Sequence, residues 1–251
     1  IPLCLVGSEM CIRDRNTLLP PSDFLGYKLG DKFTPHHLVV DYLFHVSQNE
    51  PNVKIIEYGK TYEGRPLMLA FISSVDNMDK LEQIRKDNLT RAGIIKGSTK
   101  TKKVGIVWLS YNVHGNEANS TEAAMKTLHA LADKSNINTQ EWLKNTVVII
   151  DPSVNPDGRD RYANWYRMTA NRWPDADPLG REHMEPWPGG RTNHYYFDLN
   201  RDWAWQTQIE SQQRIIKYNE WLPHIHVDFH EQGYNSPYFF APAAKPLSLI
   251  H

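Results

Sequence analysis

The sequence predicts an α/β fold in which helices cover both faces of a mixed central β-sheet. Short apolar runs, which are typical of buried strands, alternate along the chain with longer segments that carry apolar residues at helical spacing. The chain has 251 residues, 40% of them hydrophobic, and this is enough for one substantial core. We therefore expect one domain rather than two.

The predicted elements begin with a helix at Thr34 and Pro35, because a capping residue followed by proline is a helix start signal. A polar turn then joins two strands, at residues 53–58 and 66–72, into a hairpin. Later apolar runs predict strands at 104–109, 146–150 and 224–229, and helical spacing predicts helices at 77–92, 117–133 and 204–222. The stretch from 151 to 197 is too long for a simple connection, so we expect it either to be functional or to contain unrecognised structure.

Polar residues follow three of the predicted buried strands. His114 comes after the strand at 104–109, Asn155 after the next strand, and His230 after the last one. Active sites in α/β sheets lie off the carboxyl ends of the strands. We therefore expect these residues at one edge of the sheet.

The spacing of His114 and Glu117 is typical of a zinc site. Imidazole nitrogen and carboxylate oxygen both bind zinc, and a catalytic zinc ion usually takes three protein ligands. His230 is the best candidate for the third, because it also ends an apolar run. The same His-x-x-Glu pattern occurs in ordinary surface turns, so the prediction of one zinc ion depends on further motifs.

Five segments supply those motifs in a fixed order: residues 59–67 (GKTYEGRPL), 114–117 (HGNE), 155–158 (NPDG), 198–201 (DLNR) and His230. Through them the chain, from about residue 52 to 241, resembles the zinc carboxypeptidase family of carboxypeptidase A and B type. The resemblance implies a phosphorylase/hydrolase-like fold, one Zn²⁺ ion and an extracellular or periplasmic location. It also implies that a zinc-activated water hydrolyses the C-terminal peptide bond of peptides or proteins.

The resemblance assigns roles to individual residues. It implies that the two histidines and the glutamate named above hold the zinc, and that Asp198 accepts a hydrogen bond from the first metal-binding histidine. It implies that Asn200 and Arg201 bind the free carboxylate at the end of the substrate. A planar guanidinium suits this task, because it can form two parallel hydrogen bonds with a carboxylate.

The family also places an arginine beside the carbonyl that is attacked, where it stabilises the oxyanion. Four arginines between residues 155 and 174 are candidates: Arg159, Arg161, Arg167 and Arg172. Of these we favour Arg167.

Two departures from the family concern the general base and a substrate-capping tyrosine. Both residues lie well beyond the third zinc ligand in the family, and this chain stops soon after His230. We therefore expect both to be absent and the chain, as written, not to turn over peptides. Glu231 follows the ligand directly, but neighbouring strand residues point to opposite faces, so it is expected to point away from the metal.

The two ends of the chain explain this shortfall. Residues 1–15 and 246–251 look like translated adaptor sequence, which leaves residues 16–245 as part of a single zinc peptidase domain that is incomplete at its C-terminus. Cys4 and Cys11 both fall in the first tail, so the remainder has no cysteine for a disulfide or a thiolate site.

Composition excludes two classes of partner. A formal net charge of −1 and 23% charged residues argue against a nucleic-acid surface, which needs clustered basic residues. The apolar runs are far shorter than the ~20 residues of a membrane span. We expect a monomer that acts on peptide C-termini.

Two alternatives remain open from the sequence. The first is a zinc deacylase of the aspartoacylase type, which cleaves N-acyl amino acids and shares the HGNE and DLNR motifs. The second is a catalytically silent homologue that binds peptide tails without cutting them.

Overall fold

The computed structural model describes residues 17–233. The predicted tails at 1–15 and 246–251, with Cys4 and Cys11, lie outside the described residues. Within them, five strands form one sheet in the order β1-β2-β4-β3-β5. These strands are β1 (Val53–Lys60), β2 (Pro66–Ile72), β3 (Gly105–Ser110), β4 (Thr146–Asp151) and β5 (Ile225–Asp228).

The sheet is mixed. β1, β2 and β4 pair antiparallel, whereas β3 is parallel to both β4 and β5. A long crossover must therefore connect β3 to β4 and β4 to β5, because parallel neighbours cannot be joined by a hairpin. The predicted hairpin of β1 and β2 is present as expected.

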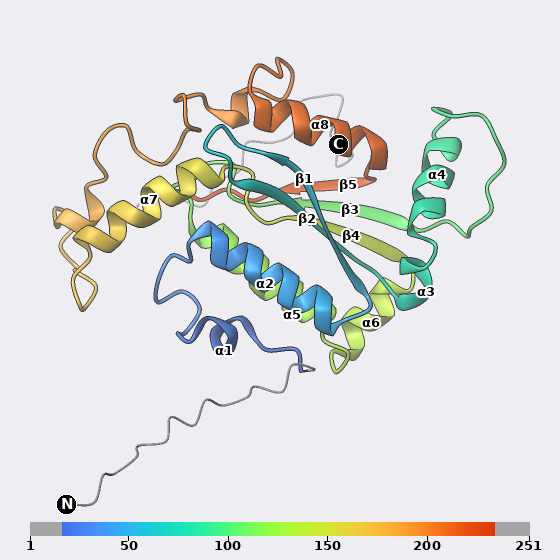
Figure 1. The fold of residues 1–251 in the computed structure, drawn as a ribbon, viewed down its shortest axis with the longest axis horizontal. Coiled ribbons are helices and arrows are strands. Elements are labelled where there is room, and N and C mark those ends of the chain that lie inside the picture. Colours follow the sequence, from blue (N-terminus) through green and yellow to red (C-terminus); the bar gives the residue numbers. More distant parts are fainter. Residues whose placement is uncertain (1–16, 234–251) are drawn as a thin grey trace, which may run out of the picture.

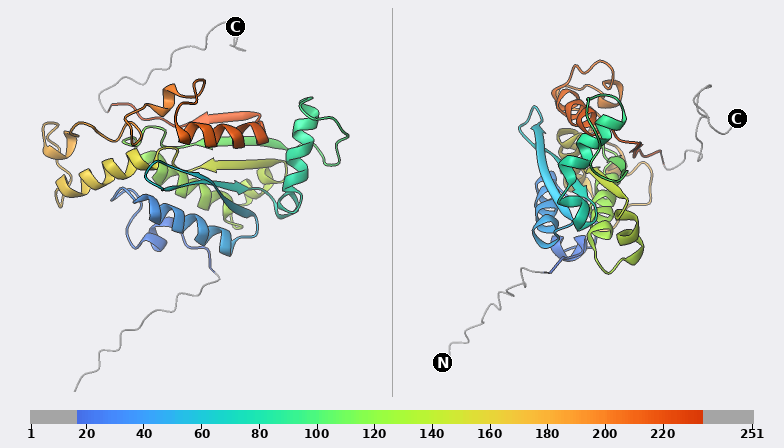
Figure 2. Two further views of the ribbon diagram at one scale, coloured as in Figure 1. Left: turned by 45° about the horizontal axis from the view of Figure 1, so that its top comes forward. Right: turned by 90° about the vertical axis from the view of Figure 1, so that its right-hand side faces the viewer.

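Helices lie on both faces of this sheet, which confirms the predicted fold class (Figures 1 and 2). The helices are α1 (Pro21–Leu25), α2 (His36–Asn49), α3 (Val75–Met78), α4 (Leu81–Arg91), α5 (Asn119–Ala132), α6 (Ile137–Leu143), α7 (Pro156–Thr169) and α8 (Ile209–Trp221), with short 3₁₀ turns η1 (Arg181–His183) and η2 (Leu199–Arg201). None of the helices within 17–233 is both long and apolar enough to cross a bilayer.

Two apolar cores result, one on each face. Residues of α2 and α5, such as Tyr42 and Met125, pack on Ile150 and its neighbours on one face. Ile84 of α4 and Trp221 of α8 pack against Trp108 of β3 on the other. Successive strand residues alternate between the faces, so each buried strand supplies both cores.

The carboxyl ends of the three parallel strands share one register. Ser110 of β3 pairs with Asp151 of β4 on one side and with Asp228 of β5 on the other. By strand periodicity these three residues point to the same face as Trp108, which α8 covers. A polar row therefore ends the sheet on the α8 face.

Several element boundaries differ from the prediction. The helix expected at 77–92 is divided into α3 and α4, and the helix expected at 204–222 begins at Ile209. Before α8, the Asp202 carboxylate accepts hydrogen bonds from Thr207 N (2.9 Å) and Gln208 N (2.9 Å). Such local side-chain bonds compete with helical ones and hold this segment in a loop.

Helix α7 was not predicted as an element, although its start signal is in the sequence. The Asn155 side chain accepts a hydrogen bond from Gly158 N (3.0 Å), and Pro156 occupies the first helical position. Both features favour a helix start. The long connection before α8 thus contains a helix that extends from the edge of the sheet (Figure 1).

Candidate metal centre

The first two predicted ligands lie in a loop that Asn112 organises. Asn112 follows β3 with a positive φ of 58°, and its buried amide donates to the carbonyls of His114 (2.8 Å), Gly115 (3.2 Å) and Glu117 (3.1 Å). One side chain therefore binds three backbone carbonyls of the same loop. This fixes the conformation that brings His114 and Glu117 to the same side.

The loop is also held by close backbone packing. A Cβ at Gly115 would collide with backbone atoms of Gly158 and Gly190, and a Cβ at Gly158 would collide with Gly190. Three glycines from three separate segments therefore meet behind the loop, where a side chain does not fit. The long connection after α7 is in this way fixed against the loop that carries His114.

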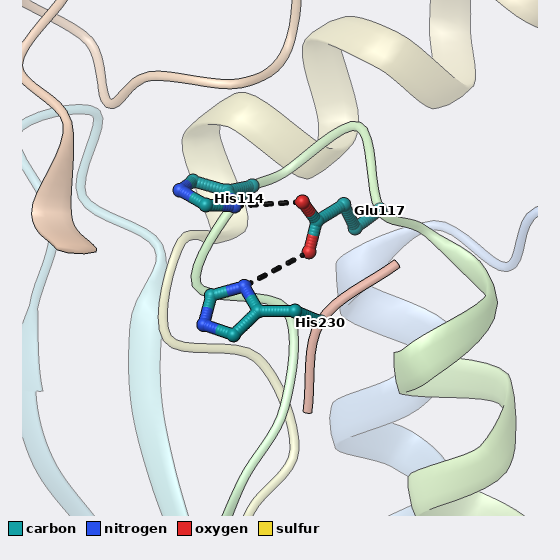
Figure 3. A group of neighbouring side chains, drawn as sticks. All are labelled: His114, Glu117 and His230. Carbon is teal, nitrogen blue, oxygen red and sulfur yellow. Dashed lines mark hydrogen bonds and ion pairs between the residues drawn. The ribbon is translucent and has the colours of Figure 1, made fainter. Parts of the chain in front are cut away.

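His114, Glu117 and His230 come together as one cluster (Figure 3). The Glu117 carboxylate lies between the rings, with Oε1 at 2.7 Å from His114 Nδ1 and Oε2 at 3.1 Å from His230 Nδ1. The three donor atoms lie within 4.8 Å of one another, so the cluster could hold a metal ion. Two imidazole nitrogens and a carboxylate oxygen are a donor set that suits zinc.

The outer nitrogens of both rings face carboxylates. His114 Nε2 lies 3.2 Å from Asp198 Oδ1, and His230 Nε2 lies 3.0 Å from Asp228 Oδ2. Each ring can therefore donate from Nε2, which leaves the Nδ1 lone pair for a cation. Without a cation, Nδ1 can only donate to the Glu117 carboxylate.

The electrostatics of the cluster favour a bound cation. Burial would raise the pKa of Glu117, but hydrogen bonds from His114, His230 and the Glu231 N–H outweigh it and lower the pKa to about 2. Hydrogen bonds to Asp228 and Glu117 raise the pKa of His230 to about 10. Glu117, between the two Nδ1 atoms, and Asp228, behind the His230 ring, thus both favour positive charge at the cluster.

The predicted substrate-binding residues lie next to the cluster, in the 3₁₀ turn η2. Asp198 begins this turn by accepting a hydrogen bond from Asn200 N (2.9 Å). Arg201 is exposed and lines a pocket of about 260 Å³ together with Phe197, Asp198 and Trp205. The same turn therefore presents Asp198 to the metal cluster and Arg201 to solvent.

The favoured oxyanion residue, Arg167, is not brought to the cluster. It is exposed in the last turn of α7. At a rise of about 1.5 Å per residue this is roughly 14 Å along the axis beyond Gly158. Arg159 and Arg161 of the same helix instead bind backbone carbonyls, for example Thr34 O and Asn193 O.

Arg191, which the sequence analysis did not single out, does reach the cluster. Its Nη2 lies 3.0 Å from Asp198 Oδ2, and its Nη1 lies 4.0 Å from Glu117 Oε1. It follows Gly189 and Gly190 in a loop without regular periodicity, so only that glycine pair could have indicated a constrained position.

Glu231 directs its side chain away from the two rings. Its carboxylate accepts hydrogen bonds from Asn119 N (2.9 Å) and Asn119 Nδ2 (3.3 Å) at the start of α5. Its backbone N–H donates to Glu117 Oε2 (3.0 Å). Glu231 therefore supports the cluster through its main chain.

Comparison with known proteins identifies relatives of this fold. The family described as zinc carboxypeptidase matches residues 39–220. Thrombin activatable fibrinolysis inhibitor superposes with a TM-score of 0.54 and 14% identity, over 85% of this chain and 52% of that one. Carboxypeptidase A from Helicoverpa armigera gives a TM-score of 0.51 and 18% identity, over 85% and 52%. At these identities the superpositions show a shared fold.

The chain spans about half the length of these two structures. It covers 40% of a metallo-carboxypeptidase from Burkholderia cenocepacia (18% identity, TM-score 0.49, 78% of this chain). No curated protein sequence matched.

Proposed function

The chain belongs to the zinc carboxypeptidase family, and from this premise we propose that the complete protein is a zinc-dependent metallocarboxypeptidase that releases the C-terminal residue of peptides. The observation that carries the proposal is the cluster of His114, Glu117 and His230, whose donor atoms lie within 4.8 Å of one another. The family match does not favour the deacylase or the silent homologue.

We propose that His114 and His230 bind one zinc ion through Nδ1, and Glu117 through its carboxylate. The donor types fit the ion, and the outer nitrogens of both rings have carboxylate partners. When bound, zinc supplies a nucleophilic water at neutral pH and polarises the substrate carbonyl.

The neighbouring residues would bind and orient the substrate. Arg201 and Asn200 lie on the turn that starts at Asp198, so a substrate carboxylate held by Arg201 would set the last peptide bond near the cluster. For the residue that stabilises the oxyanion, the positions favour Arg191 over Arg167, because only Arg191 contacts Asp198 and approaches Glu117.

The metal site is tested by the zinc content of His230→Ala in the full-length protein. The wild type should retain one equivalent after dialysis, and the variant should lose it, because one of three ligands is removed. His37→Ala, at an exposed position on α2, is the matched control and should keep its zinc. One equivalent of zinc in His230→Ala would show that the ligand assignment is wrong.

The substrate class is tested with Arg201→Ala. Activity on peptides with a free C-terminus should fall strongly while zinc content stays intact, because a charge-assisted contact is lost away from the metal. Amidated peptides and N-acyl amino acids serve as comparison substrates. An unchanged preference for free over amidated ends would contradict the role of Arg201, and preferred hydrolysis of N-acyl amino acids would contradict the peptidase assignment.

A further inference from the structure

Asp228 lies at the end of β5, two residues before His230. The strand ends at Asp228 and the chain then turns toward the cluster, so that His230 Nε2 comes to 3.0 Å from Asp228 Oδ2. The pattern Asp-x-His therefore places a carboxylate directly behind the ring.

The two histidines of the cluster are held in the same way but by different parts of the chain. The carboxylate behind His114 is Asp198, which comes from the turn η2, far along the chain. The carboxylate behind His230 is its own near neighbour. In both cases Nδ1 faces Glu117 and Nε2 faces a carboxylate.

We propose that Asp228 is a positioning residue for the metal, which holds the His230 ring in the orientation and tautomer that presents Nδ1 to a zinc ion. This inference deepens the proposed function and rests on it. A histidine that binds a metal commonly donates its other N–H to a carboxylate, and losing that partner typically reduces metal affinity about 10-fold to 100-fold.

His230 needs such a partner more than His114 does. The side chain of His114 is 4% exposed, whereas that of His230 is 32% exposed. Packing therefore restrains the first ring, and hydrogen bonds must restrain the second. Within residues 17–233, the side chains that hydrogen-bond the His230 ring are Glu117, itself a proposed ligand, and Asp228.

Asp228 is itself held in place from the sheet. It pairs in register with Ser110 of β3, and Ser110 Oγ lies 2.9 Å from His226 Nε2 on the same face of β5. The Oδ1 atom of Asp228 is buried. It lies on the face of the sheet that is covered by α8, the helix that carries the buried Arg214. One oxygen thus faces the interior and the other faces His230.

The test is the zinc affinity of the full-length protein, measured by competition with a chromophoric chelator. Asp228→Ala should bind zinc about 10-fold to 100-fold more weakly than the wild type. Asp228→Asn keeps an oxygen that can accept from Nε2, so its loss should be smaller. Asp151→Asn is the matched control, because it changes a buried carboxylate of the same polar row without touching His230, and its affinity should equal that of the wild type.

Two further measurements separate positioning from folding. Thermal unfolding in excess chelator reports the metal-free fold, and the stabilisation gained on adding zinc reports the site. The absorption spectrum of the Co²⁺-substituted protein reports ligand geometry, which should change in Asp228→Ala and not in Asp151→Asn. If Asp228→Ala does not fold, the nearly isosteric Asp228→Asn carries the test, with a several-fold loss expected.

The outcomes distinguish a failure of the proposed metal site from a failure of the proposed role of Asp228. A wild-type protein that binds no zinc would contradict the proposed metal site itself. Zinc binding by the wild type with unchanged affinity in both Asp228 variants would overturn this inference alone. An equal loss in Asp151→Asn would also overturn it, because the effect would then belong to the buried charges and not to the contact with His230.

Discussion

The two sides of the metal cluster are built differently. On the side of His114, Arg159 is fully buried, and its guanidinium donates to Thr34 O (3.0 Å), Ala118 O (2.6 Å) and Glu122 Oε1 (2.6 Å). On the side of His230, Arg214 is equally buried, yet within residues 17–233 none of its nitrogens has a hydrogen-bond partner. Its guanidinium lies instead over the Trp203 ring, 4.2 Å from the centroid.

This difference separates a fixed half of the site from a less constrained half. The loop with His114 and Glu117 is fixed by Asn112, by the three meeting glycines and by the satisfied Arg159. β5, which leads to His230, exposes 56% of Ile225 and 36% of Val227. The fixed half presents two ligands ready for a metal, and the third depends on local hydrogen bonds.

The largest effect on stability is expected from removing Arg159 and its buried hydrogen bonds. Arg159→Met leaves the buried Glu122 carboxylate without its cation, and removing one partner of a buried pair typically costs about 3–5 kcal/mol in the free energy of unfolding. Denaturant unfolding measures it. Lys144→Met, which removes a surface ion pair with Glu141, is the control and should cost no more than about 1 kcal/mol. Equal losses in the two variants would contradict the comparison.

A pH-dependent effect on stability is expected from Asp151, which lies in the same polar row as Asp228. Burial raises the pKa of Asp151 to about 7, while in the unfolded chain it is about 4. Between these values the folded protein binds a proton that the unfolded chain has released. The free energy of unfolding therefore falls as pH rises from about 4 to about 7, by roughly 2–4 kcal/mol, and this contribution is constant above that range.

Asp151→Asn should remove that contribution, since the amide resembles the protonated carboxyl. The wild type minus variant difference in unfolding free energy, measured from pH 4 to pH 8, should decline with pH and then level off. A difference that does not change with pH would show that Asp151 does not retain its proton in the folded state.

The smallest effect is expected from Arg214→Met, which tests the same buried residue type as Arg159→Met without breaking a hydrogen bond seen within residues 17–233. The variant loses the contact with the Trp203 face, so the free energy of unfolding should fall by about 1 kcal/mol. Chemical denaturation under the conditions used for Arg159→Met makes the two values comparable. A loss as large as that of Arg159→Met would mean that Arg214 is bonded as fully as Arg159.

The sequence predicted the parts of the fold that depend on local patterns. Apolar runs located all five strands to within two residues, and the polar residues after them predicted the edge at which His114 and His230 meet. The family resemblance is confirmed by the match over residues 39–220. These features follow from periodicity and from the direction of parallel strands.

Features that depend on distant contacts were not predictable in the same way. Arg191 comes from a loop whose path is set by its packing against Gly115 and Gly158, and no periodic pattern reports such a path. The start of α8 was missed because Asp202 binds the backbone ahead of it. Asp228 did carry a signal, because a carboxylate two residues before a candidate ligand can reach its ring, but the sequence does not show how the chain turns after β5.

The position of β5 in the sheet has a consequence for the order in which the molecule folds. Glu117 and His230 stand 113 positions apart, and closing a flexible segment of that length costs roughly 4 kcal/mol of chain entropy. The β1–β2 hairpin needs only a short turn, so it can form early. We expect β5 to join β3 late, when most of the sheet already exists. Zinc binding would then mark the completion of folding and not any local step within it.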